Sequence, residues 1–256
     1  MSTSLFTVLL MSATRLFSSQ PLLENSNLLL DAAQSRYLSR SLRARPGDEI
    51  VMFDGAGGEL RATIATIDKS GVLVTTGERQ ASSIESPLAI HLVQGISRGD
   101  RMDTVVQKAT ELGVTYITPV ITNYSVVRLD EQRAQKRQAH WQKIAQSSCE
   151  QCGRNTVPIV AQPIPLLNWF GDTPADETTR LMLRPGATTS LSAAKLAGAS
   201  VTLMIGPEGG FSDTEYANGS ACGFQHVTLG PRILRTETAA VAAISVAQSV
   251  WGDFAG

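Results

Sequence analysis

Cysteine is scarce in this chain, which argues against a secreted protein that depends on disulfides. Only three cysteines, Cys149, Cys152 and Cys222, occur among 256 residues. Secreted domains that depend on disulfides carry a dense and even set of cysteines, so a disulfide framework is not expected. Cys149 and Cys152 form a C-x-x-C pair, but a structural zinc site uses four ligands and the sequence holds no second pair. We therefore expect a reducing, cytoplasmic setting and no metal site.

Long apolar runs are missing too, as is an excess of charge of either sign. No stretch approaches the roughly 18 to 20 apolar residues that a membrane span requires. The short apolar run within Met1–Arg15 has no basic residue before it, which argues against a signal peptide. The chain has 22 Lys and Arg against 23 Asp and Glu, a net charge of -1. Any contact with nucleic acid therefore has to come from local basic patches.

What the chain does contain is enough apolar mass for one or two folded domains, at 43% hydrophobic residues. The first third predicts a small β-rich domain, an antiparallel sheet or barrel, because short β-branched runs alternate with Gly-rich turns. These runs are Glu49–Gly55, Gly58–Asp68 and Gly71–Gly77. Ahead of them, helical spacing up to Pro46-Gly47 predicts a helix whose apolar face is Ala33, Tyr37, Leu38 and Leu42.

After a polar, linker-like stretch at Ala81–Pro87, strand and helix patterns alternate to the end of the chain. Strands are predicted near Leu88, Val114, Val157, Thr179, Val201 and Phe224. Between them, Met102, Val105, Val106, Ala109 and Leu112 mark one helix, residues 130–152 a long polar one, and Ser212 with Glu215 the start of a third. A last helix runs from Thr236 to about Trp251. This alternation predicts a mostly parallel sheet covered on both faces.

Two loops of unusual composition follow predicted strands, where parallel sheets bind ligands. The first is "MIGPEGGFSDTE", Met204–Glu215, and the second is "LGPRILRTETAA", Leu229–Ala240. Glycines let the backbone approach a ligand closely and leave its amides and carbonyls accessible. Taken alone, the first loop is equally explained as a tight turn with a capping box, and neither loop matches the standard phosphate motifs. Two such loops, separated by one helix and one strand, can lie side by side.

These two loops resemble the signature motifs of the SPOUT methyltransferases, specifically the RsmE family, which methylates uridine N3 in small-subunit (16S) ribosomal RNA. The stretches "SRGDRMDTVVQKATELGV", "WQKIAQSSCEQCGR" and "TRLFSSQPL" agree with that family. The resemblance covers about Arg15 to Trp251. It leaves residues 1–12 without an assigned role, and leaves open whether Met11 is the true start.

The resemblance implies a PUA-like RNA-binding β-barrel domain at residues 1–83 and an α/β SPOUT methyltransferase domain at residues 84–256. That second domain has a mostly parallel sheet, and its chain end threads a trefoil knot. The resemblance further implies a homodimer and a bent S-adenosylmethionine, which leaves as S-adenosylhomocysteine. The donor pocket carried over from the family comprises Leu183, Gly206, Pro207, Glu208, Gly209, Leu229, Gly230, Ile233, Leu234, Arg235, Glu237 and Thr238. Apolar walls beside exposed loop amides suit adenine and a methionyl chain.

Uridine N3 carries a proton and is a poor nucleophile until that proton leaves. A base has to accept the proton, or positive charge has to stabilise the uracil anion. We assign the electrostatic role to Arg235 and the proton-accepting or orienting role to Glu208; the alternative for Glu208 is a solvated turn residue. Arg15, within the family's N-terminal pattern, is a third catalytic candidate that also contacts RNA. The sequence does not fix which group accepts the proton.

Local basic patches supply the predicted RNA contacts. Arg36, Arg40 and Arg43 lie on one side of the first predicted helix and suit phosphate binding, although such arginines often form a solvated face. Arg154, in the family-like "EQCGR", is predicted to line the target-base pocket or the dimer. His91, within an apolar strand, is predicted to be a core residue.

Two alternatives stay open on the sequence alone. The same donor pocket could serve a related SPOUT enzyme that methylates a ribose 2'-hydroxyl or another base. The chain could instead be a non-catalytic RNA-binding factor in assembly of the small ribosomal subunit, with a vestigial pocket.

Overall fold

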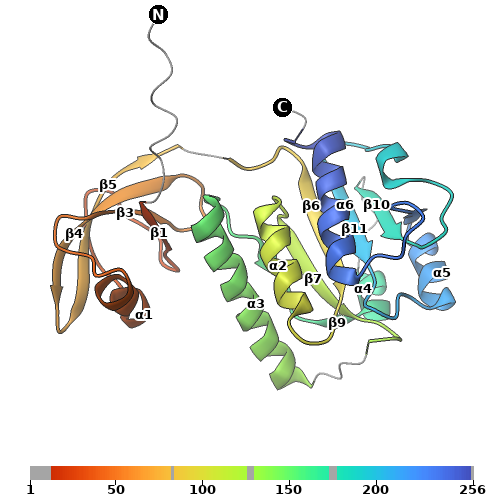
Figure 1. Cartoon of the computed structure of the whole chain (residues 1–256), viewed down its shortest axis with the longest axis horizontal. Helices are drawn as coiled ribbons and strands as arrows, with labels where there is room; N and C mark the ends of the chain where they lie inside the picture. Colours follow the sequence, from red (N-terminus) through yellow and green to blue (C-terminus); the bar gives the residue numbers. More distant parts are fainter. Residues whose placement is uncertain (1–12, 82–83, 126–129, 173–177, 255–256) are drawn as a thin grey trace, which may run out of the picture. The chain divides into compact units, whose positions relative to one another are not determined.

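The computed structural model describes residues 13–81, 84–125, 130–172 and 178–254, which form two compact units (Figure 1). The first unit contains the chain up to Ile84 together with Cys149–Thr156, and the second contains Glu85–Ser148 and the chain from Val157 onward. The predicted domain boundary between residues 83 and 84 borders residues 82–83, which are outside the described residues. Met11, the alternative start, also lies outside them. The boundary stays a prediction.

The first unit is built on a five-stranded sheet. Its strands are β1 (Thr14–Phe17), β2 (Asn27–Leu29), β3 (Glu49–Phe53), β4 (Glu59–Asp68) and β5 (Gly71–Gln80), in the order β1-β3-β4-β5-β2. Only the β1–β3 pair is parallel. Side chains alternate between buried and exposed along much of β4 and β5, because one face of the sheet packs against an apolar core. The three predicted strands are confirmed, while β1 and β2 were not predicted.

An ion pair stabilises the turn after β3. Arg79 donates to both carboxylate oxygens of Asp54, at 3.2 and 2.7 Å, and the backbone amides of Leu22 and Ala56 donate to the same carboxylate. Burial alone would raise the pKa of Asp54, but these hydrogen bonds outweigh it and lower that pKa to about 2. Asp54 therefore stays ionised in the folded protein across the ordinary pH range.

The first helix is shorter than the sequence predicted. It comprises α1 (Ala32–Arg36), capped by the Asp31 side chain, and a π-helical turn, η1 (Tyr37–Ser41). Arg43 follows with a φ of 54°, a left-handed conformation that ends the helix well before Pro46. Of the predicted apolar face, only Leu38 is buried. The prediction that Arg43 lies on this helix is wrong.

The second unit contains a seven-stranded sheet in which every pair is parallel. Its strands are β6 (Ala89–Gly95), β7 (Tyr116–Ile121), β8 (Ile159–Val160), β9 (Ile164–Pro165), β10 (Thr179–Leu183), β11 (Ser200–Ile205) and β12 (Gln225–Val227). The order is β12-β10-β11-β6-β7-β8, and β9 also pairs with β7. The predicted parallel sheet is confirmed.

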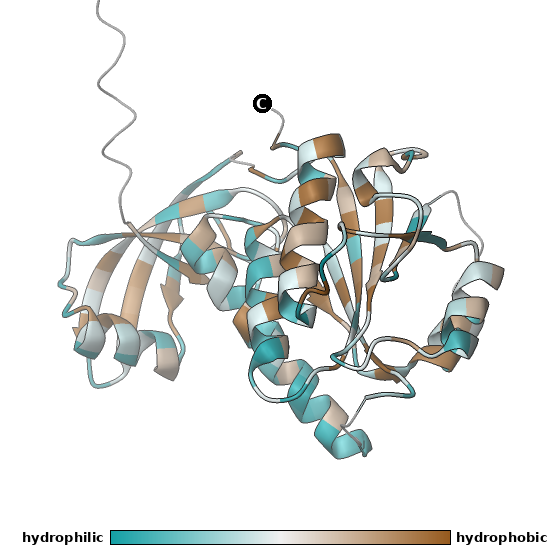
Figure 2. Cartoon of the chain, turned by 45° about the vertical axis from the view of Figure 1, so that its right-hand side comes forward, coloured by the Kyte–Doolittle hydropathy of each residue, from teal (hydrophilic) through white to brown (hydrophobic). Residues whose placement is uncertain are grey.

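Helices cover both faces of this sheet. They are α2 (Arg101–Glu111), α3 (Glu131–Cys152), α4 (Leu166–Asp172), α5 (Asp213–Ala221), α6 (Thr236–Trp251) and a short 3-10 turn, η2 (Leu191–Ala193). On one face, α2 and α6 share a large apolar core with the strands; on the other, α4 and α5 share a smaller one. Figure 2 shows the apolar strands inside and the polar length of α3 outside. The predicted bounds of α3 and α6, and the capping box at Ser212, are confirmed.

Candidate active site

Three loops lie together at the carboxyl ends of the neighbouring strands β12, β10 and β11. They are residues 184–190, 206–212 and 228–235, and the first and third also pair through a Ser190–Thr228 bridge. Leu183 and Leu229 pack partly buried against the main core beneath these loops. Parallel sheets bind ligands at this edge. The structure thus brings together the two loops that the sequence singled out, and adds the loop after β10.

The loop 206–212 packs so closely against its neighbours that two glycines, one in the loop and one in β6, leave no space for a side chain. A Cβ on Gly95, at the end of β6, would lie 2.4 Å from Pro207 Cδ, and one on Gly209 would lie 2.7 Å from Tyr124 Cβ. Separations below 3 Å force the backbone to move, and Pro207 cannot swing aside. The loop is therefore held in one position by direct backbone contact.

A buried chain of hydrogen bonds joins two of the loops. Thr236 Oγ1, at the first residue of α6, donates to the Gly206 carbonyl at 2.7 Å, and Gln94 Nε2 donates to Thr236 Oγ1 at 2.9 Å. Gln94 is 0% exposed and also donates to the Gly95 carbonyl. Its Oε1 is buried without a hydrogen-bond partner among the described residues. Buried hydrogen bonds of this kind fix the relative position of the loops.

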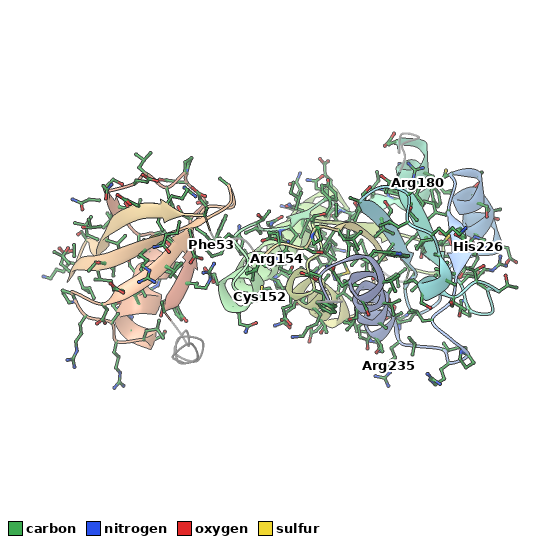
Figure 3. All side chains as sticks on the ribbon, turned by 90° about the horizontal axis from the view of Figure 1, so that it is seen from above. Phe53, Cys152, Arg154, Arg180, His226 and Arg235 are labelled. Atoms are coloured by element: carbon green, nitrogen blue, oxygen red, sulfur yellow. The ribbon has the colours of Figure 1, made fainter. Side chains whose placement is uncertain are left out.

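The segment that leads into α6 presents polar and apolar groups outward. Ile233 is 87% exposed, and Arg235, at the N-cap of α6, is exposed on the outside of the unit (Figure 3). Arg235 makes no side-chain capping bond, and a cation at a helix N-terminus is unfavourable. Local stability would favour Ser, Thr or Asp there, so an arginine at this position indicates a function other than capping.

Two carboxylates, one in the loop 206–212 and one in the first turn of α6, lie within ion-pair distance of the same arginine. Arg101, at the start of α2, donates to Glu208, and its Nε lies 4.0 Å from Glu237 Oε2. The Arg98 amide also donates to Glu208, at 3.1 Å. Burial acts to raise the pKa of Glu208, but hydrogen bonds from backbone amides and Arg101 outweigh it, and the pKa lies below its usual value. Glu208 is thus a fixed carboxylate and a weak proton acceptor.

A cavity of about 790 Å³ adjoins this charged cluster. Its lining is Arg98, Gly99, Asp100, Arg101, Thr104, Tyr124, Glu208, Gly209 and Glu237. The sequence alone predicts no role for Arg98, Arg101 or Tyr124, although both arginines lie in the family-like "SRGDRMD" stretch. These residues come together only in the folded protein, because β6 and β7 end beside the loop that carries Glu208.

The two arginines predicted around the target nucleotide are engaged inside the first unit. Arg15 donates to Glu59 Oε2 and Asn155 Oδ1, each at 2.6 Å, and lies over the Phe53 ring. Arg154 is only 3% exposed. Arg36, Arg40 and Arg43 are exposed, as phosphate binding requires. All five RNA assignments stay predictions, and the engagement of Arg15 and Arg154 does not favour theirs.

Two kinds of feature are missing from the described residues. Across the part of the chain that the structure describes, no three His, Cys, Asp or Glu side chains gather as a metal site. Within the same residues, no helix combines the length and apolar character needed to cross a bilayer.

Comparison with known proteins agrees with the geometry. Residues 84–248 match a family model described as an RNA methyltransferase domain, and residues 30–76 match an RNA methyltransferase PUA domain. A ribosomal RNA small subunit methyltransferase E from Buchnera aphidicola is 36% identical over 90% of this chain and 93% of its own length. The enzyme of that name from Bacillus subtilis is 29% identical over 88% of this chain and 91% of its own.

Solved structures extend the match to three dimensions. A ribosomal RNA small subunit methyltransferase E from Neisseria gonorrhoeae, bound to S-adenosyl methionine, has a TM-score of 0.88 and 40% identity, covering 95% of this chain and 100% of that one. A Legionella pneumophila protein with bound SAM has a TM-score of 0.90 and 38% identity over the same shares. The chain therefore belongs to the RNA methyltransferase family that includes ribosomal RNA small subunit methyltransferase E.

Proposed function

We propose that this protein transfers a methyl group from S-adenosylmethionine to N3 of a uridine in 16S ribosomal RNA of the small subunit. The observation that carries the proposal is the Thr236–Gly206 hydrogen bond, which joins the two Gly-Pro segments at the carboxyl edge of the parallel sheet, where sheets of this class bind ligands. A solved relative that is 40% identical to this chain is bound to S-adenosyl methionine, which supports that donor. The RNA substrate is inferred from the relatives' names, which give ribosomal RNA of the small subunit. The reaction is supported by the chemistry of the site.

The residues of the loops fit the donor. Leu183 and Leu229 offer partly buried apolar surface, and the glycine-rich turn after β11 leaves its backbone groups accessible. Two buried polar atoms, Gln94 Oε1 and Glu237 Oε2, have no hydrogen-bond partner among the described residues. Buried polar atoms in that state are suited to bind a polar ligand or an ordered water. S-adenosylmethionine, when bound, supplies a methyl group on a positively charged sulfur.

The chain's own residues then have to activate and hold the acceptor. Removal of the N3 proton leaves a uracil anion whose charge spreads to its oxygens, and a fixed cation stabilises that anion. We assign this role to Arg235, which is exposed at the N-cap of α6. Glu208, held ionised by Arg101, takes the orienting role rather than the proton-accepting one. The proton leaves to solvent or to a group of the RNA complex.

The finer features of the family are proposed with this function. The chain end passes through a trefoil knot, the protein acts as a homodimer in the cytoplasm, and the exposed Arg36, Arg40 and Arg43 contact RNA phosphates. The first unit, which matches the PUA model, holds the RNA, because exposed arginines on a compact β domain suit backbone contacts.

The deciding experiment is nucleoside mass spectrometry on small-subunit ribosomal RNA from a strain that lacks the protein. We expect 3-methyluridine to be absent and to return when purified protein and donor are added to the subunits. An unchanged level, or the loss of a 2'-O-methylated nucleoside instead, would refute the uridine N3 assignment. Calorimetry with S-adenosylmethionine adds a second arm, since a non-catalytic assembly factor with a vestigial pocket would bind none.

A further inference from the structure

The face of the second unit's sheet that carries α4 changes character along its strands. Under α4 this face is apolar, with Met182, Met204 and Val93 buried. Two residues earlier in the same strands, the pairing aligns one row across β10, β11, β6 and β7. That row is Arg180, Thr202, His91 and Tyr116. Sheets of this class are ordinarily apolar on both faces, so a row of polar and amphipathic side chains is unexpected.

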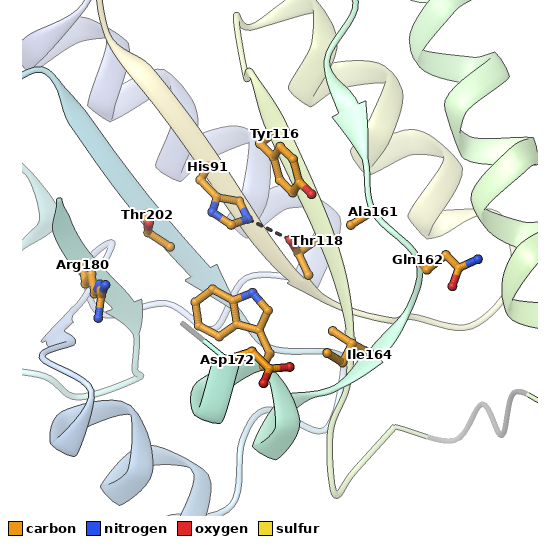
Figure 4. A pocket seen from close by; sticks show the side chains of 10 residues that line it. His91, Tyr116, Thr118, Ala161, Gln162, Ile164, Asp172, Arg180 and Thr202 are labelled. Atoms are coloured by element: carbon orange, nitrogen blue, oxygen red, sulfur yellow. Dashed lines mark hydrogen bonds between the residues drawn. The ribbon is translucent and has the colours of Figure 1, made fainter. Parts of the chain in front are cut away.

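The row lines a cavity of about 410 Å³ (Figure 4). The remaining lining comes from β7, α4 and the segment around β9: Thr118, Trp169, Asp172, Ala161, Gln162 and Ile164. In Figure 4, Arg180 and Gln162 lie at opposite ends, with His91 and Thr118 between them. The prediction that His91 is a core residue is wrong, because its side chain is half-buried and lines this cavity.

Aromatic rings dominate the middle of the cavity. The His91 ring lies 4.9 Å from the Tyr116 ring at 77°, and 6.0 Å from the Trp169 ring at 73°. His91 Nε2 and Thr118 Oγ1 share a hydrogen bond of 2.8 Å, which holds the imidazole in place. Tyr116 is 36% exposed, so part of this aromatic surface is accessible to a ligand.

The charges and polar groups of the lining indicate the kind of ligand. Among the described residues that line the cavity, Arg180 is the one cation and Asp172 the one anion, so this lining carries no net charge and favours a neutral polar group over a phosphate. Arg180 is fixed by donating to the Cys222 carbonyl at 2.9 Å. Gln162 is exposed and offers both a donor and an acceptor. Aromatic surface combined with directed polar groups is how proteins bind unstacked bases, including on the open sheet of RNA-recognition modules.

We propose that this cavity binds an unpaired base of the substrate RNA, at a site separate from the one that holds the methylated uridine. The cavity lies near the beginnings of the strands, whereas the donor loops follow their ends. Thr202, in β11, precedes Gly206, the first residue of the loop after this strand, by four residues, which corresponds to roughly 13 Å at the rise of a strand. This proposal rests on the proposed function, since it takes RNA as the substrate.

The test is a tryptophan-fluorescence titration of the full-length protein with uridine, cytidine, adenosine and guanosine. S-adenosylhomocysteine is kept saturating so that no nucleoside enters the donor site. Trp169, 9% exposed in the cavity wall, is the reporter. We expect saturable quenching by at least one nucleoside, weakened about fivefold or more by Tyr116→Ala and about threefold to tenfold by Gln162→Ala. Gln135→Ala, an exposed glutamine on α3, is the matched control and should change nothing.

Two further readouts distinguish binding in this cavity from binding elsewhere on the protein. Trp169→Phe should abolish the quenching; quenching that persists would come from another tryptophan and would refute the site. In methyl transfer, Gln162→Ala should raise KM for the ribosomal RNA and leave kcat and the donor KM unchanged. Absence of quenching by all four nucleosides, or equal quenching in Gln162→Ala and the parent, would also refute it. Failure of the parent to methylate RNA would refute the proposed function, while the titration would still decide this one.

Discussion

Replacing Thr236 by valine tests whether the loops need their buried link. Valine has nearly the shape of threonine but no hydroxyl, and the site is only 4% exposed. The Gly206 carbonyl would lose its donor, while Gln94 Nε2 would keep the Gly95 carbonyl. A buried group left unpaired costs about 1 to 3 kcal/mol. In a protein of this size that lowers Tm by roughly 2 to 12 °C.

The same substitution should weaken donor binding, because the freed loop has to be ordered again each time S-adenosylmethionine binds. If the full 1 to 3 kcal/mol is expressed there, affinity falls about fivefold to 150-fold. Calorimetry measures this affinity, and thermal unfolding measures stability. Thr110→Val is the matched control, since the Thr110 hydroxyl is also buried and donates to a backbone carbonyl, that of Val106, within α2. A Thr236→Val protein that loses stability yet binds the donor normally would refute the positioning role.

Three further predictions concern the site and the first unit. Gly95→Ala should destabilise by about 1 to 3 kcal/mol and abolish measurable donor binding, because its Cβ would lie 2.4 Å from Pro207 Cδ; unchanged calorimetry would contradict the close contact. Arg101→Ala should let the pKa of Glu208 rise toward its usual value, so that the acid limb of the kcat profile moves to higher pH, whereas Arg101→Lys should retain most of the parent profile. Asp54, with its pKa lowered from 3.8 to about 2, should stabilise the protein by about 2 kcal/mol above pH 4. That contribution is lost as the pH falls toward 2, and denaturant titrations of the parent and Asp54→Asn should converge there.

The sequence predicts the second unit well because its elements have strong local signals. Most of the strands are runs of mainly apolar residues, and α6 begins at Thr236 and ends at Trp251 as its composition indicates. The first helix was predicted too long because nothing local marks the left-handed turn at Arg43. The short strand β1 was missed because four residues carry too little pattern, and its pairing partner lies 36 residues further along.

The candidate site also has parts that the local sequence predicts and parts that it does not. The Gly-Pro loops after apolar runs predict the edge of the sheet at which we propose that the donor binds, because glycine and proline mark special backbone conformations in the local sequence. The bond between Arg101 and Glu208 joins residues 107 positions apart, and no spacing rule reaches that far. The row of Arg180, Thr202, His91 and Tyr116 could not be predicted from the sequence for the same reason, because it forms only when four strands pair in one register.

The first unit is not a single continuous stretch of chain, and this affects how it is made. Phe17 donates its amide to Glu150, and Arg15 donates to Asn155, so β1 is completed by residues from the end of α3 onward. During synthesis these residues emerge only after the whole of Glu85–Ser148, which belongs to the other unit. Until α3 has been made, β1 therefore has its pairing with β3 but lacks the hydrogen bonds to Glu150 and Asn155. A protein cut after residue 84 would keep its strands but leave Arg15 without Asn155.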